Sequence, residues 1–233
     1  FSVAAFQSRA RVAEASIVSG GKVPLLVGGS GLYFRAVVDD LTFPATHGPT
    51  RRELAAEAAA LGPDVLHGRL LRLDPQAAAR IEPRNARRTV RALEVAAVTG
   101  RLFSSFRRGW ERYPRGRVRA AGVAIEPEVL GRRIDARVVA MLEGGLVEEV
   151  RGLLARGFGP FLTSSQAIGY LEVVEHLEGR LDASEMRRRI ARRTRALARR
   201  QMAWFRRDPR IRWFRVGEEG AVEAVDEIGE HLR

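Results

Sequence analysis

The sequence predicts an α/β fold that carries an inserted all-α module, and three observations point to it. A short apolar run, Val23–Val27, follows a helical pattern and ends at glycines, which is typical of a buried parallel strand. Two further strand patterns, 118–125 and 211–216, are each followed by helical patterns. Between the first and second strands, residues 45–105 hold helix signals and no strand signal.

The first predicted strand is flanked by two helices. An amphipathic pattern over 6–19 ends at Gly20-Gly21, and a second helix begins near Ser30, at the carboxyl end of the strand. Open α/β sheets bind ligands at that edge, and Gly28, Gly29 and Gly31 would allow a close approach. Backbone N–H groups at such a helix start can hold phosphate, although a tight strand-to-helix turn has the same pattern.

Helix starts then follow in quick succession through the module. Pro49-Thr50, Gly62-Pro63, Asp74-Pro75 and Asn85 are each helix-starting patterns. They predict helices over 51–60, 64–73, 76–81 and 86–98. The stretch 106–117 is basic, aromatic and punctuated by glycine and proline, which predicts a loop.

The remainder of the chain returns to the α/β pattern. Its predicted helices run from Pro127 to Ala155 with a bend near Gly144-Gly145, and over 166–177, 182–206 and 222–232. Asp182 with Glu185 three residues later resembles a capping box. Gly169 inside a helix costs about 1 kcal/mol relative to alanine, which hints at a close approach there, although simple helix packing is the alternative.

Composition limits the class of function. The 233 residues include 40 basic and 28 acidic side chains, a net charge of +12, and Lys22 is the single lysine. Arginine suits phosphate, and a positive field favours a polyanionic partner, although a GC-rich coding sequence would also raise the ratio of arginine to lysine. The absence of cysteine excludes disulfides, thiolate metal sites and cysteine catalysis. No apolar run approaches the roughly 20 residues of a membrane helix, so we expect a cytoplasmic protein with no membrane partner.

Two arginine patterns are candidates for anion binding. Residues 187–215 hold thirteen arginines and one acid, Asp208, interleaved with Trp204, Phe205, Trp213 and Phe214. A solvated helix face normally mixes signs, so this pattern favours contact with phosphate or RNA. Arg133 and Arg137 are four residues apart and could hold one anion together, although alone they also fit ordinary surface charge.

Together these segments resemble the tRNA dimethylallyltransferases, also called tRNA isopentenyltransferases. The matching motifs occur in the family's order along nearly the whole chain. They are Pro24–Tyr33, Arg88–Val95, Arg133–Arg137, Ala167–Tyr170, and Thr194-Arg195 followed by Arg199–Arg206.

The resemblance implies a fold, an activity and partners. The fold is a P-loop NTPase-like parallel-sheet core, here 1–44 and 106–233, with an inserted helical tRNA-contacting domain, 45–105. The activity transfers a dimethylallyl group from dimethylallyl diphosphate to N6 of the adenosine that lies 3′ of the anticodon. The implied partners are the tRNA anticodon stem-loop and dimethylallyl diphosphate, with Mg²⁺ as cofactor, and we expect a monomer.

The resemblance also assigns residues to the site. Arg137 with Arg133 corresponds to the diphosphate-binding position, and Ser30 keeps the hydroxyl of a usual threonine near the reacting base. The implied tRNA contacts are Ser30, Arg51, Arg87, Arg88, Thr89, Val90 and Arg91, then Gln166, Ala167, Ile168, Gly169, Tyr170 and Leu171, and finally Arg199, Arg200, Gln201, Trp204 and Arg206.

The sequence departs from the family at its beginning. Family members start with a GPTxxGK[ST] phosphate loop and a following segment that carries the general base, whereas Phe1–Phe6 matches a segment downstream of both. We therefore expect a fragment whose catalytic base lies upstream of Phe1, and these 233 residues to bind tRNA without transferring a prenyl group. The alternatives are a catalytically dead tRNA-binding remnant and a small-molecule kinase related through the P-loop fold.

Overall fold

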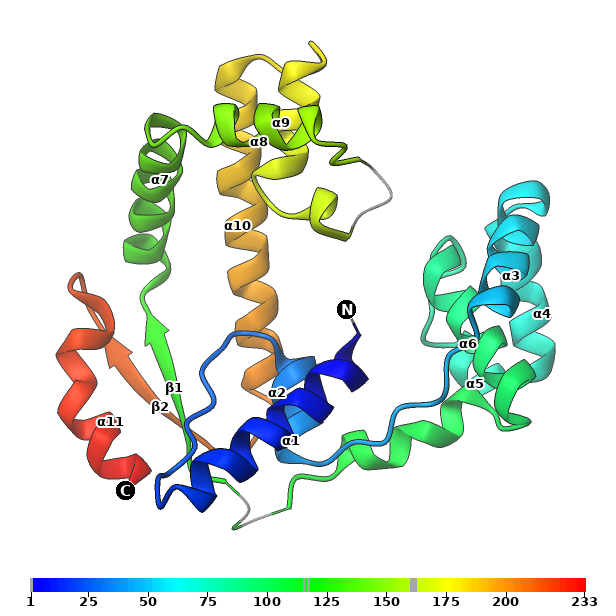
Figure 1. Ribbon diagram of the computed structural model, residues 1–233, viewed down its shortest axis with the longest axis horizontal. Helices are drawn as coiled ribbons and strands as arrows, with labels where there is room; N and C mark the ends of the chain where they lie inside the picture. The colour runs from blue at the N-terminus through cyan, green and yellow to red at the C-terminus, as the bar shows by residue number, and fades with distance from the viewer. Residues whose placement is uncertain (1, 115, 117, 160–162) are drawn as a thin grey trace. The chain divides into compact units, whose positions relative to one another are not determined.

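The computed structural model describes residues 2–114, 116, 118–159 and 163–233, and it is mostly helical with a small parallel sheet. The chain divides into two compact units, Phe1–Arg117 and Val118–Arg233, and each is described by itself (Figure 1). No helix in the described ranges is long and apolar enough to cross a membrane.

The first unit is helical throughout its described residues. Its elements are α1 (Val3–Ser19), α2 (Gly31–Val38), α3 (Gly48–Leu61), α4 (Pro63–Leu73), α5 (Pro75–Ala78), α6 (Ala86–Thr99) and a 3-10 helix, η1 (Phe103–Glu111). The four predicted helix starts are confirmed by α3 to α6, and the predicted caps Asp74 and Asn85 accept hydrogen bonds from the first turns of α5 and α6. The helix predicted over 76–81 is too long, since α5 ends at Ala78. The predicted loop over 106–117 is wrong in its first half, where η1 lies.

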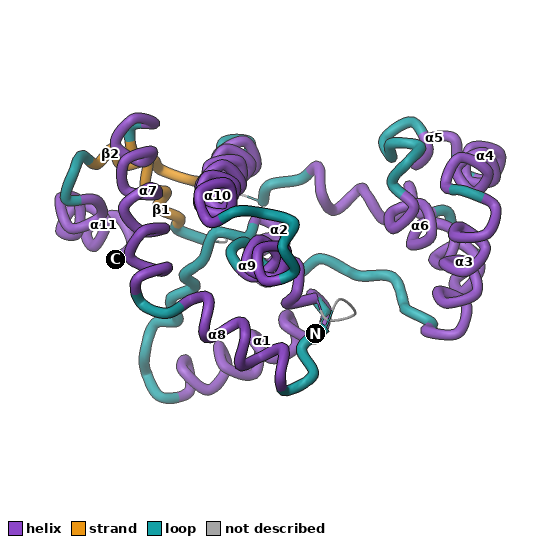
Figure 2. The backbone as a smooth tube through the Cα atoms, turned by 90° about the horizontal axis from the view of Figure 1, so that it is seen from above, coloured by secondary structure: helices purple, strands orange, loops and turns teal. Residues whose placement is uncertain are grey.

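Helices α3 to α6 share one hydrophobic core, and they lie together in both views of the backbone (Figures 1 and 2). Leu54 of α3, Leu66 and Leu70 of α4, and Leu93 of α6 are buried in it. Elsewhere in the unit, α1 packs on α2 through the edge-to-face rings of Phe6 and Tyr33, whose centroids are 4.7 Å apart.

The predicted strand Val23–Val27 is wrong. These residues are assigned to no strand, and Val23, Leu25 and Val27 are 87, 70 and 82% exposed. An apolar run becomes a strand only when a neighbouring strand pairs with its N–H and C=O groups. In the described part of the chain, the one sheet pairs other residues, so the run forms no strand.

The second unit combines a parallel strand pair with long helices. Its elements are β1 (Ala120–Ile125), α7 (Pro127–Glu143), α8 (Leu146–Ala155), η2 (Thr163–Gln166), α9 (Tyr170–Leu177), α10 (Ala183–Phe205), β2 (Ile211–Val216), η3 (Gly220–Ala224) and α11 (Val225–Leu232). Both strands, the bend at Gly144-Gly145 and the long helix after Asp182 confirm the predictions. The connection from β1 to β2 runs through α7 to α10, since parallel strands need a long crossover.

Gly122 of β1 leaves room for the side chains of β2 that pack against the strand. Gly122 lies opposite Trp213, and a Cβ at Gly122 would come within 2.7 Å of the Trp213 ring and 2.8 Å of the Ile211 side chain. Both neighbours are held by the sheet, so a larger residue forces the strands apart.

We therefore expect Gly122→Ala to lower the free energy of unfolding of the second unit by about 1–3 kcal/mol through overpacking. Gly152 of α8 is the matched control because nothing lies within 4 Å of its Cβ position. There, alanine should raise stability by about 0.5–1 kcal/mol through helix propensity. Urea denaturation measures both, and equal effects would contradict the close packing at Gly122.

Candidate nucleic-acid interface

Helix α10 carries eight of the thirteen arginines in the run 187–215. The Asp182 side chain accepts a hydrogen bond of 2.8 Å from the Glu185 amide and so starts the helix. Met186, Ile190 and Ala191 are buried on one face and pack in the core shared with α7, α8 and α9. This packing fixes which arginines face outward.

Most arginines in the first half of α10 are paired with acids, and Arg187 is the exception within the described ranges. Arg193 pairs with Glu172, Arg189 with Glu175, and Arg195 with Asp135 at 2.5 Å. The expectation that this run lacks compensating acids is therefore wrong for its first half. The acids of these three pairs come from α7 and α9, far away in the sequence, because the fold places those helices beside α10.

The second half of α10 presents cations without such partners. Arg199, Arg200 and Arg206 are exposed, and none of their side chains forms an ion pair or hydrogen bond within the residues that the structure describes. Gln201 is half-buried, and the Trp204 side chain is 38% exposed beside them. Guanidinium groups that can bind phosphate therefore lie close to an indole that can stack on a base.

The segment Gln166–Leu171 is held against α10 through a buried carboxylate. Glu172 is 0% exposed, accepts a 2.8 Å hydrogen bond from the Gly169 amide, and pairs with Arg193. Arg193 also donates to the Gln166 carbonyl at 3.3 Å. The sequence analysis missed Glu172, although its position three residues after Gly169 is the N3 position of a capping box.

Gly169 does not lie inside a helix, so the predicted helix 166–177 is wrong at its start. Gly169 is the N-cap of α9 at φ +99°, a conformation that favours glycine, and η2 ends at Gln166. The neighbouring Tyr170 hydroxyl donates a hydrogen bond to Glu149, and this bond, with some burial, raises the pKa of Tyr170. Ala167 is exposed and Ile168 and Leu171 are half-buried, so this turn presents a mixed surface.

The predicted diphosphate pair lies on α7. Arg133 and Arg137 are both exposed, four residues apart on one helix face. Arg133 packs against Gly220, whose Cβ position lies 2.5 Å from an Arg133 guanidinium nitrogen. Its charge also helps to hold the pKa of Glu223 below its ordinary value, after the larger effects of hydrogen bonds from the Gly217 and Glu219 amides. The Arg137 side chain forms no ion pair or hydrogen bond among the described residues.

Ser30 precedes α2 and is exposed at its N-cap position. Its side chain forms no capping hydrogen bond, and the space beside Gly28 is open, with nothing within 4 Å of a Cβ there. The Ser30 hydroxyl is therefore accessible to a ligand at the start of α2.

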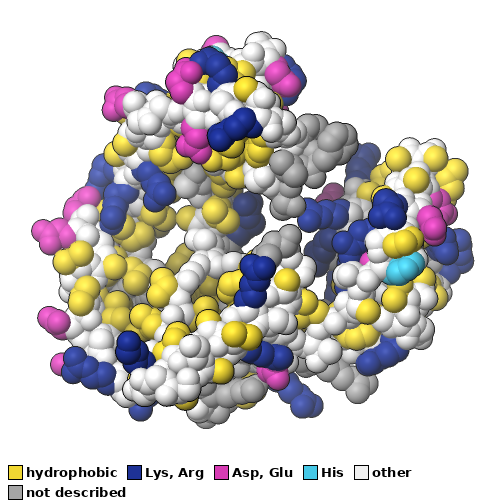
Figure 3. Space-filling model, in the orientation of Figure 1, with side chains coloured by type: hydrophobic (Ala, Val, Ile, Leu, Met, Phe, Trp, Pro, Cys, Tyr) yellow, Lys and Arg dark blue, Asp and Glu magenta, His cyan; other side chains and the backbone are white. Residues whose placement is uncertain are grey.

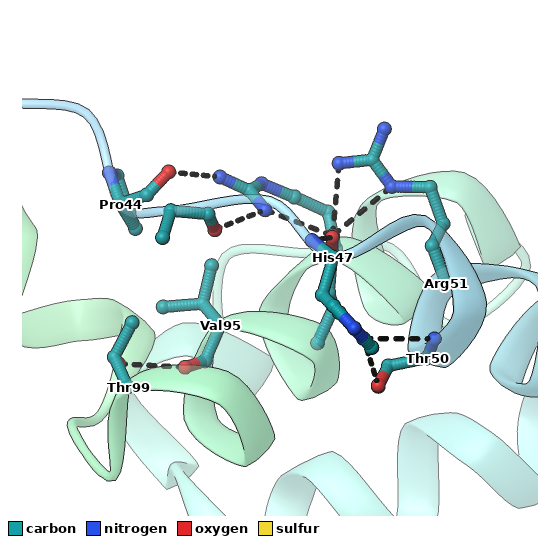
Figure 4. A network of polar contacts seen from close by, with 9 residues as sticks. Pro44, His47, Thr50, Arg51, Val95 and Thr99 are labelled. Atoms are coloured by element: carbon teal, nitrogen blue, oxygen red, sulfur yellow. Dashed lines mark hydrogen bonds and ion pairs between the residues drawn. The ribbon is translucent and has the colours of Figure 1, made fainter.

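In the first unit, two predicted tRNA contacts converge on one buried carboxylate (Figure 4). Glu94 is 0% exposed, and its Oε2 accepts hydrogen bonds from Arg51 at 2.9 and 3.0 Å and from Arg91 at 2.8 Å. The His47 amide donates to its other oxygen at 2.8 Å. Arg91 also donates to the Pro44 carbonyl at 2.8 Å, which ties the start of the module to α6.

The other predicted contacts on α6 divide by exposure. Arg87 and Arg88 are exposed, whereas Val90 and Thr89 are 5 and 0% exposed, so those two side chains support the helix rather than face a partner. The Thr89 hydroxyl has no hydrogen-bond partner in the described residues. Glu94 was missed by the sequence analysis, although its place three residues after Arg91 puts both on one helix face.

The Glu94 network makes the stability of the first unit depend on pH. Burial alone would raise the pKa of Glu94, but hydrogen bonds from Arg91, the His47 amide and Arg51 outweigh it and hold the pKa below 4.5. A carboxylate with a lowered folded-state pKa stabilises the fold above its unfolded pKa, and this contribution is lost as the pH falls through the folded value.

We therefore expect the free energy of unfolding of the first unit to fall as the pH drops below about 4.5. Glu94→Gln should remove that part of the slope, whereas Glu57→Gln, at an exposed pair with Arg69, should leave it unchanged. Urea denaturation at pH 3 to 7 measures the slopes, and a native slope in the Glu94 variant would contradict this assignment.

A metal site is not apparent in the parts of the chain that are described. Across residues 2–114, 116, 118–159 and 163–233, no three His, Asp or Glu side chains are placed to hold a metal ion. The described residues therefore offer no ligand set for the Mg²⁺ that the resemblance implies. Basic side chains spread over the face shown in Figure 3.

Known proteins match the chain along most of its length. A family model described as IPP transferase matches residues 1–208. A tRNA dimethylallyltransferase from Nocardioides sp. is 48% identical over 95% of this chain and 71% of its own length, and one from Kineococcus radiotolerans is 50% identical over 91% and 66%. The crystal structure of a tRNA isopentenylpyrophosphate transferase from Bacillus halodurans is 35% identical, with a TM-score of 0.63, over all of this chain and 74% of that one.

Proposed function

Because the chain belongs to the IPP transferase family, we propose that it acts in tRNA modification. The reaction moves a dimethylallyl group from dimethylallyl diphosphate to N6 of the adenosine 3′ of the anticodon. The relatives named tRNA dimethylallyltransferase support this, and the observation that carries it is the group of exposed, unpaired arginines beside Trp204. Family membership favours this function over a small-molecule kinase.

We propose that residues 1–44 and 106–233 form a P-loop NTPase-like core. Residues 45–105 then form an inserted domain that contacts tRNA. The parallel pair β1–β2 with its helical crossover supports the core. The separate hydrophobic core of α3 to α6 supports the inserted domain, since a domain needs a core of its own.

The proposed role of Arg137, with Arg133, is to bind the diphosphate. In the reaction, N6 forms a bond to the first carbon of the dimethylallyl group as that carbon's bond to the diphosphate oxygen breaks. Negative charge grows on the leaving oxygen, and cations stabilise it. Arg137 suits this role because it is exposed and its side chain forms no ion pair in the described ranges. Mg²⁺ is proposed only as a cation bound to the diphosphate.

The proposed RNA contacts divide between binding and positioning. Arg199, Arg200 and Arg206 bind phosphate, and Trp204 stacks on an unpaired base, as is usual for RNA loops. Gln166 to Leu171 contact the loop from a turn that Glu172 fixes. Ser30 offers its hydroxyl near the reacting base, while Arg51, Arg87, Arg88 and Arg91 contact the RNA from the inserted domain. The buried Thr89 and Val90 side chains support the helix that carries these arginines. The proton that N6 loses needs a base, and none of these 233 residues is assigned to that role.

The test is incubation of the purified chain with unmodified tRNA and dimethylallyl diphosphate. We expect tRNA binding that weakens with salt. Nucleoside mass spectrometry then measures transfer. No binding at any salt concentration would contradict the proposed function. Binding without transfer is expected of these 233 residues, because they hold no GxxxxGK[ST] motif and no assigned base. Transfer would show that they contain a base after all.

A further inference from the structure

A groove between α7 and α10 is lined by arginines that the proposed site does not use. Its volume is about 540 Å³, and it lies wholly within the second unit. Arg187, Arg188, Arg192 and Arg195 of α10 line it, with Asp135 as the one acid of its lining. Val138 and Ala191, which are buried in the hydrophobic core, also line it and make part of it apolar.

The arginines of the groove exceed the carboxylates that neutralise them. Arg188 and Arg192 share Glu185, at 3.0 and 3.8 Å, and Arg195 pairs with Asp135. Arg187 forms no ion pair within the described ranges. The Arg188 and Arg192 side chains are 61 and 65% exposed, and exposed ion pairs contribute only about 0–1 kcal/mol, so a phosphate can replace their shared carboxylate at little cost.

The groove is continuous with the arginines at the second half of α10. Arg188, Arg192, Arg195 and Arg199 follow at steps of four, three and four residues, which puts them on one helix face. With a rise of about 1.5 Å per residue, this row spans about 17 Å. It begins in the groove and ends at Arg199, next to Arg200, which lies about one helical turn before the exposed Trp204.

The groove differs from the predicted diphosphate pair. Arg137 is two residues from Asp135 on α7, so their side chains point about 200° apart around the helix. Arg133 and Arg137 therefore leave α7 on a different side from the groove lining.

We propose that the α7–α10 groove binds a stretch of RNA sugar-phosphate backbone, as an extension of the contact at Arg199 and Arg200. This proposal rests on the proposed function and adds a second tRNA-binding surface to the protein. Arginine forks bind phosphate oxygens in pairs, and the apolar lining can contact the sugar. A second copy of the chain is disfavoured as occupant, because molecules with a net charge of +12 repel one another.

The test compares two triple variants that lose the same charge. Arg187→Gln/Arg188→Gln/Arg192→Gln removes the cations of the groove, and Arg151→Gln/Arg156→Gln/Arg180→Gln removes three exposed arginines elsewhere in the unit. Fluorescence anisotropy with full-length unmodified tRNA, over a range of salt concentrations, gives the Kd and its salt dependence. We expect the groove variant to bind at least about tenfold more weakly with a shallower salt dependence, and the control to change less than about threefold.

Two further results keep the outcome clear. Arg187→Glu alone breaks no ion pair of the described residues, so it should weaken binding without unfolding the helix even if the triple variant is unstable. If the groove variants bind tRNA as the control does, the inference is wrong while the proposed function stands. If the unsubstituted chain fails to bind tRNA, the proposed function itself is wrong.

Discussion

Reversing the charge of Arg199 and Arg200 should weaken tRNA binding by about 100-fold or more. Hydrogen bonds to charged groups contribute about 1.5–3 kcal/mol each, so two lost phosphate contacts account for an effect of that size. Both side chains are exposed and unpaired among the described residues, so the double variant Arg199→Glu/Arg200→Glu disturbs no internal ion pair. The fold should therefore remain, as circular dichroism and thermal unfolding would show.

The matched control reverses Arg151 and Arg156 of the same unit. Both arginines are exposed on or next to α8, and Arg151 pairs with Glu148. Because two arginines become glutamates in each double variant, the change in net charge is the same. We expect a loss of affinity below about fivefold, from the weaker overall field alone. Equal losses for the two double variants would mean that net charge, and not a site at the end of α10, binds the RNA.

Replacing Arg35 by methionine should lower the free energy of unfolding of the first unit by about 3–5 kcal/mol, because it leaves a buried carboxylate without its cation. The Arg35 and Asp39 side chains are both 2% exposed and form an ion pair in α2. The same guanidinium donates to the Arg112 carbonyl at 2.8 Å and lies 4.3 Å from the centre of the Tyr113 ring. Arg35 therefore connects α2, just after Ser30, to the segment that follows η1.

The control is the same change at a neighbouring exposed pair. Arg11 pairs with Asp40, and their side chains are 53 and 51% exposed, so Arg11→Met should cost about 0–1 kcal/mol. The double variant Arg35→Met/Asp39→Leu should recover part of the stability that the single variant loses, since it also removes the buried Asp39 carboxylate. Urea denaturation, followed by Trp110 fluorescence with Trp204 and Trp213 replaced by phenylalanine, measures all three. A small loss for Arg35→Met would mean that the pair is not buried in solution.

Local patterns predicted most helices because their signals lie within a few residues of each other. Asp182 and Glu185 begin α10, and Asn85 caps α6, as their spacing indicated. The run Val23–Val27 shows the limit, since an apolar sequence does not reveal whether a neighbouring strand is there to pair with it. Gly169 shows a second limit. Because glycine is unfavourable within a helix, the sequence predicted a close approach at Gly169 inside a helix, whereas the structure places Gly169 at the N-cap of α9.

The candidate site was predictable in its residues but not in their pairing. Motif resemblance located the arginines of α10, yet which of them are neutralised depends on helices distant in the sequence. Glu172 reaches Arg193 across 21 positions, and Glu94 reaches Arg51 across 43. These contacts distinguish the arginines that form internal ion pairs from those whose side chains are unpaired among the described residues.

The most direct test of the account is ultraviolet crosslinking of the chain to tRNA, followed by mass spectrometry of the crosslinked peptides. The account predicts crosslinks within Gln166–Leu171 and within Arg199–Arg206, with Trp204 among the modified residues, and their loss in the Arg199→Glu/Arg200→Glu variant. Crosslinks that avoid both segments and survive that double substitution would contradict the central claim that the unpaired arginines at the end of α10 form the RNA contact.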